Sequence, residues 1–272
     1  MRVRPPAVAG RFYPGDRGRL RAAVAGYVDC ARAHSGAGDA RVPKAIIGPH
    51  AGYMYSGPVA GTAYASVSSA RGVVERVVLI GPAHRVAVDG LVLPSADALL
   101  TPIGPAPVDR AAREVALTCT GVGTDDDAHA EEHSLEVHLP FVQHVLGTEV
   151  QVLPLLVGRA APQTVAAVVD ALWGGRETLV VVSSDLSHYH PYAVAQARDR
   201  RTASAIVNGE VDAIGPHEAC GAFPIRGLLT VARRKALDAR LLDLRNSGDT
   251  AGSTDRVVGY GAFAFSEHSG DA

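Results

Sequence analysis

Three apolar runs constrain the fold of this chain more than any other feature. They span residues 44–48, 76–81 and 178–183, and a loop rich in Gly, Pro or polar residues follows each one. Strands that are apolar throughout are typical of a parallel sheet that helices cover on both faces. The runs therefore predict an α/β fold, in which polar side chains at the carboxyl ends of the strands converge on one cleft.

The rest of the chain alternates helical and extended patterns. Residues 151–157, 240–244 and 257–265 read as strands, the last interrupted by Gly259 and Gly261, and a late hairpin would make the sheet mixed. The predicted helices span 16–34, 108–119, 162–173, 192–207 and 224–236. With no linker dividing it, the chain is expected to be a single three-layer α/β/α domain over 1–272, with a mixed, mostly parallel central sheet.

Charge and composition exclude several classes of protein. Lys+Arg total 26 and Asp+Glu 28, so the chain lacks the excess of basic residues that binding to nucleic acid requires. No apolar segment is long enough for a signal peptide or a membrane span. We expect a cytoplasmic protein that binds a small molecule or a peptide in its cleft, with no nucleic acid and no membrane as partner.

Three cysteines at wide spacing exclude a complete disulfide framework. Cys30 and Cys119 lie in helical surroundings rich in Ala, Val and Leu, and are expected to be packing residues. Cys220 follows a polar stretch and stands beside Gly221. It could be a metal ligand, a nucleophile with His188 as its base, or a buried inert thiol.

Two histidines follow predicted strands directly. His50 comes after the first run and His84 after the second, each beside Gly and Pro, where the backbone can bring a side chain close to a ligand. Imidazole is the commonest metal ligand in proteins. The pair therefore predicts a metal site, although a structural histidine with satisfied hydrogen bonds is the simpler alternative for either one.

Asp185 and His188 follow the third run and are three residues apart. If the chain turns into a helix there, both side chains point to one side, and the carboxylate can orient the imidazole. Such a pair could act as a general base or support a metal ligand. The alternative is an N-cap aspartate and a histidine in the wall of the pocket.

Residues 131–140 are dense in potential ligands. A helical turn could present His133 with Glu136, and Glu132 with Glu136, before Pro140 ends it. The His-Glu-x-x-His order of zinc proteases is absent, and a solvated acidic loop is the alternative. Tyr13 is a further residue that could bind a polar ligand. The residues predicted to line the cleft are Tyr53, Tyr55, His133, Glu136, His138 and Tyr189.

Seven ordered motifs resemble those of the Memo family, and together they run nearly from end to end. They are PAVAGRFYP (6–14), PHAGY with YSG (49–57), GPAH (81–84), EHSLEVHLPF (132–141), SSDLSH (183–188), CG (220–221) and GYGA (259–262). In prokaryotes this family is called AmmeMemoRadiSam system protein B. The name implies two companions, an AMMECR-type protein and a radical-SAM protein, as partners.

The Memo family is similar in fold to the class III extradiol dioxygenases. The resemblance implies that His50 and His84 are metal ligands, that Cys220 replaces the usual carboxylate ligand, and that His188 is the acid/base with Asp185 beside it. A thiolate moves the metal preference from iron towards copper or zinc. No separate cofactor-binding residues are predicted.

These resemblances lead to one main functional expectation and two alternatives. We expect a redox-linked protein that binds iron or copper, or an oxidoreductase of unknown substrate. The alternatives are a non-enzymatic adaptor that receives a peptide or partner protein in the cleft, and a metal-free Cys hydrolase.

Overall fold

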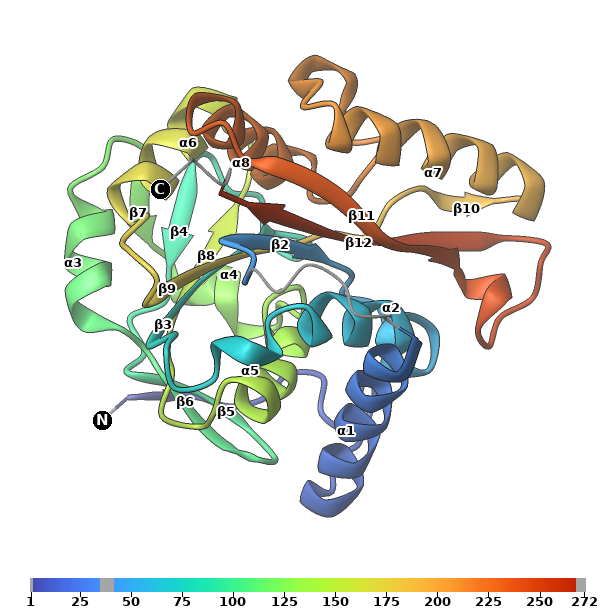
Figure 1. The fold of residues 1–272 in the computed structure, drawn as a ribbon. Helices are drawn as coiled ribbons and strands as arrows, with labels where there is room; N and C mark the ends of the chain where they lie inside the picture. The colour runs from blue at the N-terminus through green and yellow to red at the C-terminus, as the bar shows by residue number, and fades with distance from the viewer. Residues whose placement is uncertain (1, 35–41, 268–272) are drawn as a thin grey trace.

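The computed structural model describes residues 2–34 and 42–267, and its centre is one large mixed sheet (Figure 1). The order of its strands is β10-β12-β2-β9-β3-β8-β4-β7, with β11 paired to β12. A small sheet has the order β1-β5-β6. The strands are β1 (Val3–Arg4), β2 (Ala45–Gly48), β3 (Arg76–Pro82), β4 (Leu91–Leu93), β5 (Ala98–Thr101), β6 (Gly104–Pro107), β7 (Val122–Thr124), β8 (Gln151–Val157), β9 (Thr178–Ser183), β10 (His188–His190), β11 (Asp238–Asn246) and β12 (Val257–Ser266).

Helices cover both faces of the large sheet. They are α1 (Arg17–His34), α2 (Tyr53–Ala65), α3 (Arg110–Leu117), α4 (Asp126–Ala130), α5 (Leu139–Val145), α6 (Pro162–Ala171), α7 (Tyr192–Val207) and α8 (Ala222–Arg234), with short 3-10 turns at Ser68–Ala70, Glu136–His138, Val211–Ala213 and Ser247–Asp249. Residues of α1, α2 and α5 share one core, whereas those of α3, α6, α7 and α8 share the other. The fold is therefore a three-layer α/β/α arrangement, as predicted.

Alternation along the central strands explains the two cores. In β2, Ile46 belongs to the core beneath α1 and α2, and its neighbour Ile47 to the core beneath α6 and α8. Strands β2, β9, β3 and β8 run parallel. Because successive side chains of a strand point to opposite faces, a strand covered on both sides must be apolar throughout.

The late hairpin is present and makes the sheet mixed. Strand β11 pairs antiparallel with β12, and β12 pairs antiparallel with β2. Strand β12 runs unbroken through Gly259 and Gly261, contrary to the expected interruption. A Cβ atom at Gly259 would lie 2.1 Å from Asp199 Oδ2, so this glycine lets α7 approach the strand closely.

Six short strands were not expected from the sequence: β1, β4, β5, β6, β7 and β10. Each has only two to four residues. Strand β6 reads Gly-Pro-Ala-Pro, a composition that local preference would assign to a loop. Such short strands pair because longer neighbouring elements bring their segments together.

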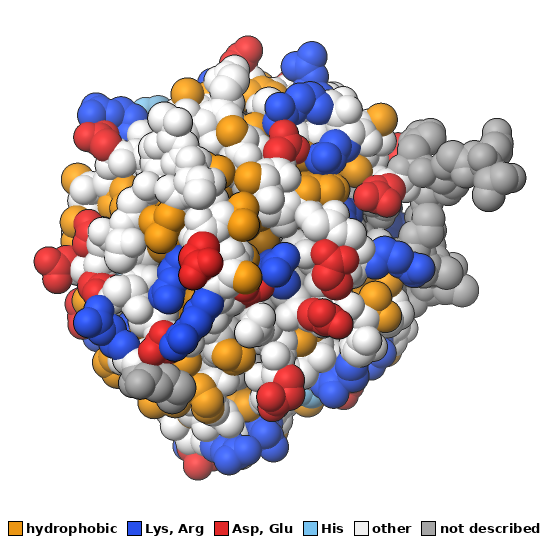
Figure 2. Space-filling model, turned by 90° about the vertical axis from the view of Figure 1, so that its left-hand side faces the viewer, with side chains coloured by type: hydrophobic (Ala, Val, Ile, Leu, Met, Phe, Trp, Pro, Cys, Tyr) orange, Lys and Arg blue, Asp and Glu red, His pale blue; other side chains and the backbone are white. Residues whose placement is uncertain are grey.

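Charges on the surface are mixed in sign. On the face shown in Figure 2, basic and acidic side chains lie between one another, with small apolar groups scattered among them. Within residues 2–34 and 42–267, no helix is both long and apolar enough to cross a bilayer. The face in view has no broad basic area of the kind that nucleic acid needs.

Candidate metal centre

His50 follows β2 and is almost completely buried. Its backbone N–H donates to Asp185 Oδ1 at 2.8 Å, and its Nδ1 lies 2.6 Å from Ser183 Oγ. The other ring nitrogen, Nε2, lies 3.3 Å from Cys220 Sγ. Residues from the end of β9 and from the loop before α8 therefore hold the ring in one orientation.

Ser183 fixes the protonation of His50. Its hydroxyl donates its only proton to the backbone oxygen of Ser134 at 2.6 Å. Its oxygen must therefore accept from both imidazoles that contact it, His50 Nδ1 and His138 Nε2, the latter at 2.9 Å. His50 thus carries its proton on Nδ1 and presents the lone pair of Nε2 towards Cys220.

Burial also keeps the His50 ring neutral. It lowers the pKa of His50 well below the ordinary value, and the nearby His84 and His133 lower it further. His138 behaves in the same way, since burial lowers its pKa to about 3. A neutral imidazole with a free lone pair is the form that binds a metal.

Glu132 orients the second histidine, His84. Glu132 accepts from the backbone N–H and from Nδ1 of His84, the latter at 3.0 Å. It also accepts from the N–H groups of His133 and Ser134. Burial would raise the pKa of Glu132, but hydrogen bonds from His133 and His84 outweigh it and hold the pKa far below the usual range. His84 Nε2 is left for another partner.

Cys220 lies just before α8 and is tied to the loop after β9. Its N–H donates to the Asp185 oxygen, and the Asp185 N–H points at Sγ, both at 3.2 Å. Burial, and then the charge of Asp185, raise the pKa of the thiol above its ordinary value. The thiol therefore holds its proton at neutral pH unless a metal ion displaces it.

Two overlapping groups of side chains could hold a metal ion. One is His50, His84 and Cys220; the other is His84, Glu132 and His133; within each group the ligand atoms lie within 4.8 Å of one another. The two oxygens of Glu132 already accept four hydrogen bonds. Glu132 is therefore better described as the carboxylate that orients His84, which leaves the first group as the stronger candidate.

His133 forms a wall of the same site. Its ring stacks on that of His84 with centroids 4.9 Å apart and contacts Phe12 at 4.8 Å. Its Nδ1 is buried and lies 3.2 Å from Glu132 Oε1, in ion-pair range, although the direction of the N–H does not suit a hydrogen bond. This histidine was expected at the cleft, and the structure places it beside the candidate ligands.

Asp185 and His188 do not share a helical face. Residues 184–187 form no helix, and His188 begins β10, where it pairs with Val258. Asp185 contacts His50 and Cys220 directly. His188 makes no hydrogen bond or ion pair with them in the described residues, although its charge lowers the pKa of Asp185 against the larger raising effect of burial.

Three residues expected to line the cleft are turned into the interior. Glu136 binds Arg4 and the N–H groups of Ala7 and Val8. The Tyr53 hydroxyl donates to the Val137 oxygen, and His138 bridges Ser183 and Tyr64. The helical turn expected within residues 131–140 does not form as predicted. Residues 132–135 are not helical, and Pro140 lies in the first turn of α5 instead of ending a turn.

The two other predicted tyrosines lie nearer the surface. Tyr55 is half-buried, and Tyr189 is 63% exposed. Tyr189 has a φ of +60°, a conformation uncommon for residues other than glycine, and Arg256 lies over its ring. Ser183, which fixes the orientation of His50, was missed because a serine at a strand end carries no distinctive signal.

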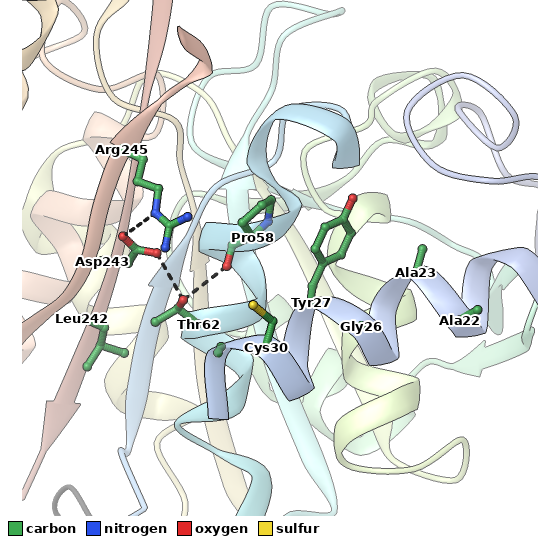
Figure 3. A pocket seen from close by; sticks show the side chains of 11 residues that line it. Ala22, Ala23, Gly26, Tyr27, Cys30, Pro58, Thr62, Leu242, Asp243 and Arg245 are labelled. Atoms are coloured by element: carbon green, nitrogen blue, oxygen red, sulfur yellow. Dashed lines mark hydrogen bonds and ion pairs between the residues drawn. The ribbon is translucent and has the colours of Figure 1, made fainter. Parts of the chain in front are cut away.

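A separate cavity lies away from the candidate centre. It has a volume of about 820 Å³ between α1, α2 and β11, and Figure 3 shows Cys30, Thr62 and Asp243 in its wall. Cys30 is exposed there, so the expectation that it is a packing residue was wrong. Cys119 is half-buried and packs against a core, as expected.

Comparisons with known proteins agree with this geometry. A family model described as Memo-like protein matches residues 4–264. The chain belongs to the Memo-like family. It is 34% identical to a MEMO1 family protein of Methanopyrus kandleri over 96% of this chain and 98% of that protein.

Other Memo relatives match equally completely. A MEMO1 family protein of Aeropyrum pernix is 35% identical over 96% of this chain and 99% of its own length. One from Aquifex aeolicus is 33% identical over 96% and 98%. The Memo-like match therefore includes every strand end that contributes to the candidate centre.

Proposed function

We propose that this Memo-family protein binds one redox-active metal ion, iron or copper, through His50, His84 and Cys220. In this proposal it works as a redox-linked metal protein or an oxidoreductase. One observation carries the proposal. The three ligand atoms come from the ends of β2 and β3 and from the loop before α8, and they lie within 4.8 Å of one another, while the Nδ1 atom of each histidine is already held by another residue.

The donor set fits such a metal. Two neutral imidazoles and one sulfur suit copper, iron or zinc, and the sulfur favours the softer metals of this group. Three protein ligands leave positions open for a further molecule. When bound, iron or copper would supply one-electron chemistry. The chain itself would orient the imidazoles through Ser183 and Glu132 and would exclude water from His50, which is only 2% exposed.

The same geometry disfavours a metal-free hydrolase. A nucleophilic cysteine needs a depressed pKa or a base in contact. Burial and Asp185 raise the pKa of Cys220, and His188, the expected base, does not contact it in the described part of the chain. The imidazole that does contact the thiol, His50, is a poor proton acceptor, because burial holds its pKa well below the ordinary value. Slow alkylation of Cys220 in metal-free protein, compared with the exposed Cys30, would agree with this reading.

Metal content tests the proposal directly. Protein purified without an affinity tag should contain close to one iron or copper ion per chain by elemental mass spectrometry. Cys220→Ser and His84→Ala should lower the affinity for the metal at least tenfold, because each variant removes a metal ligand. Loss of a residue that only orients a ligand would cost less. Cys30→Ser and Cys119→Ser are matched cysteine controls and should retain the metal.

Wild-type protein that is empty and also refuses added iron and copper would contradict the proposal. Equal loss of metal from all four variants would show that unfolding, and not ligand removal, is being measured. Zinc as the sole bound metal would retain the site but exclude the redox function. The AMMECR-type and radical-SAM companions stay a prediction, which co-purification of the three proteins would test.

A further inference from the structure

Tyr260 is a buried tyrosine at the edge of the candidate metal centre. Tyr260 lies on β12, three residues before Phe263, which pairs antiparallel with Ile47 of β2, the strand that leads into His50. The side chain is 1% exposed and belongs to the core beneath α2. Tyr260 belongs to the GYGA motif at residues 259–262, and the proposed function assigns it no role.

The hydroxyl of Tyr260 differs from those of the other buried tyrosines. The Tyr13 hydroxyl donates to Glu136, that of Tyr53 to the Val137 oxygen, and that of Tyr64 contacts His138 Nδ1. The Tyr260 hydroxyl has no hydrogen bond to any residue that the structure describes. This hydroxyl is not one of the fully enclosed side-chain atoms that lack a partner in the described residues, so it borders a space that water or a ligand can enter. A molecule bound there would supply the missing hydrogen-bond partner.

Asp185 lies beside Tyr260, because the Leu186 N–H donates to the Gly259 oxygen and the Gly259 N–H donates to the Ser187 oxygen, both at 2.8 Å. Asp185 is 4% exposed, and its Oδ1 accepts from the His50 N–H. Its Oδ2 lies 4.0 Å from His50 Nε2, too far for a hydrogen bond, and it has no other partner in the described ranges. Burial, and then the charges of Asp185, Tyr55 and Tyr189, raise the pKa of Tyr260, which agrees with a position among these three side chains.

We propose that Tyr260 and Asp185 form a subsite beside His50 that binds the hydroxyl group of a neutral small molecule. The ligand oxygen accepts from the Tyr260 hydroxyl, and the ligand proton is donated to Asp185. Tyr55 and Tyr189 provide aromatic surface for the carbon frame of the ligand. This inference rests on the proposed function, because the bound ligand would face the metal ion that the proposed function assigns to His50, His84 and Cys220.

Benzyl alcohol and benzyl methyl ether are a matched pair of probes. Both carry one oxygen on the same frame, but only the alcohol can donate a proton to Asp185. Ligand-observed NMR titrations should show that wild-type protein binds the alcohol about three- to tenfold more tightly than the ether. Tyr260→Phe should weaken binding of the alcohol by a similar factor. Tyr192→Phe, on α7 with its hydroxyl bonded to Asp249, should leave it unchanged.

A thermal melt separates this role from a structural one. Tyr260→Phe should not lower the melting temperature of ligand-free protein, because the hydroxyl has no partner to lose. Tyr64→Phe should lower it, because that hydroxyl is paired. A lower melting temperature for Tyr260→Phe would overturn the subsite in favour of a structural hydroxyl.

The titrations have outcomes that overturn the subsite independently of the metal. Equal affinity for alcohol and ether, or unchanged affinity in Tyr260→Phe, would overturn it. So would the absence of saturable binding by the alcohol, which would leave an ordered water as the only occupant. Metal content is measured in the same samples. A wild-type protein that binds the alcohol but no metal would support the subsite and refute the metal proposal.

Discussion

Glu132 and Glu136 stand four residues apart, are both buried, and do unrelated work. Glu132 lies at the strand ends, where it orients His84 and accepts from the backbone around His133. Glu136 faces the opposite way and binds the N-terminal segment through Arg4, Tyr13 and the N–H groups that follow Pro6. The first region orients the side chains of the candidate centre, and the second attaches the N-terminal segment to the rest of the chain.

The difference shows that the partner of a buried carboxylate decides its role. Arg4 is buried with Glu136, so each charge is compensated inside the protein. Arg4 also donates to the backbone oxygen of Glu132, but within the described residues the only basic side chains bonded to the Glu132 carboxylate are imidazoles. Its charge therefore acts on the two imidazoles and through them on the candidate centre.

The largest effect is expected at the structural carboxylate. Arg4→Met should lower the free energy of unfolding by about 3–5 kcal/mol, because it leaves Glu136 buried without its ion-pair partner. Urea unfolding monitored by circular dichroism measures this. The folded fraction should still bind metal as wild type does. A loss below about 1 kcal/mol, where an exposed ion pair would lie, would contradict the comparison.

Changing the other carboxylate should mainly affect the centre. Glu132→Gln should weaken metal binding about 10- to 100-fold, because the amide cannot accept from His84 as the carboxylate does. Its effect on the free energy of unfolding should be smaller, about 1–3 kcal/mol. Competition titration with a chelator gives the affinity. Unchanged affinity in Glu132→Gln together with weakened affinity in Arg4→Met would reverse the two assignments.

The smallest effect is a pH dependence in the N-terminal region. The His129 carbonyl accepts from Arg4, and burial lowers the pKa of the His129 ring to about 4. In the unfolded state His129 takes up a proton near about pH 6.5, whereas in the folded state it does so only near pH 4. The free energy of unfolding should therefore fall with decreasing pH, by at most about 1.4 kcal/mol per pH unit from this residue.

Comparison with His129→Gln isolates that contribution. Burial raises the pKa of Asp185 and Asp199 and opposes the trend, but it does so equally in both proteins. Urea unfolding at pH 7, 6 and 5 should give a shallower slope for the variant. If the free energy of unfolding changes equally with pH in both proteins, His129 is protonated in the folded state as readily as in the unfolded state.

Much of the fold follows from the sequence. The strands at 76–82, 151–157 and 178–183 and the helix at 192–207 agree with the expected ranges within a residue, because apolar periodicity and length decide long elements locally. Short strands such as β6 could not be predicted. Their pairing energy comes from neighbours far away in the chain, and their own composition favours a loop.

The candidate site divides in the same way. The sequence alone identified His50, His84 and Cys220 as candidate ligands, because strand ends mark the two histidines and the family motifs mark all three, and the structure brings them together. Only the tertiary structure decided that Ser183 and Glu132 orient the histidines, that Glu136 faces the interior, and that the Tyr260 hydroxyl has no partner among the described residues. The physical reason is that residues 131–138 and 184–187 take directions set by contacts from distant segments, which no local spacing encodes.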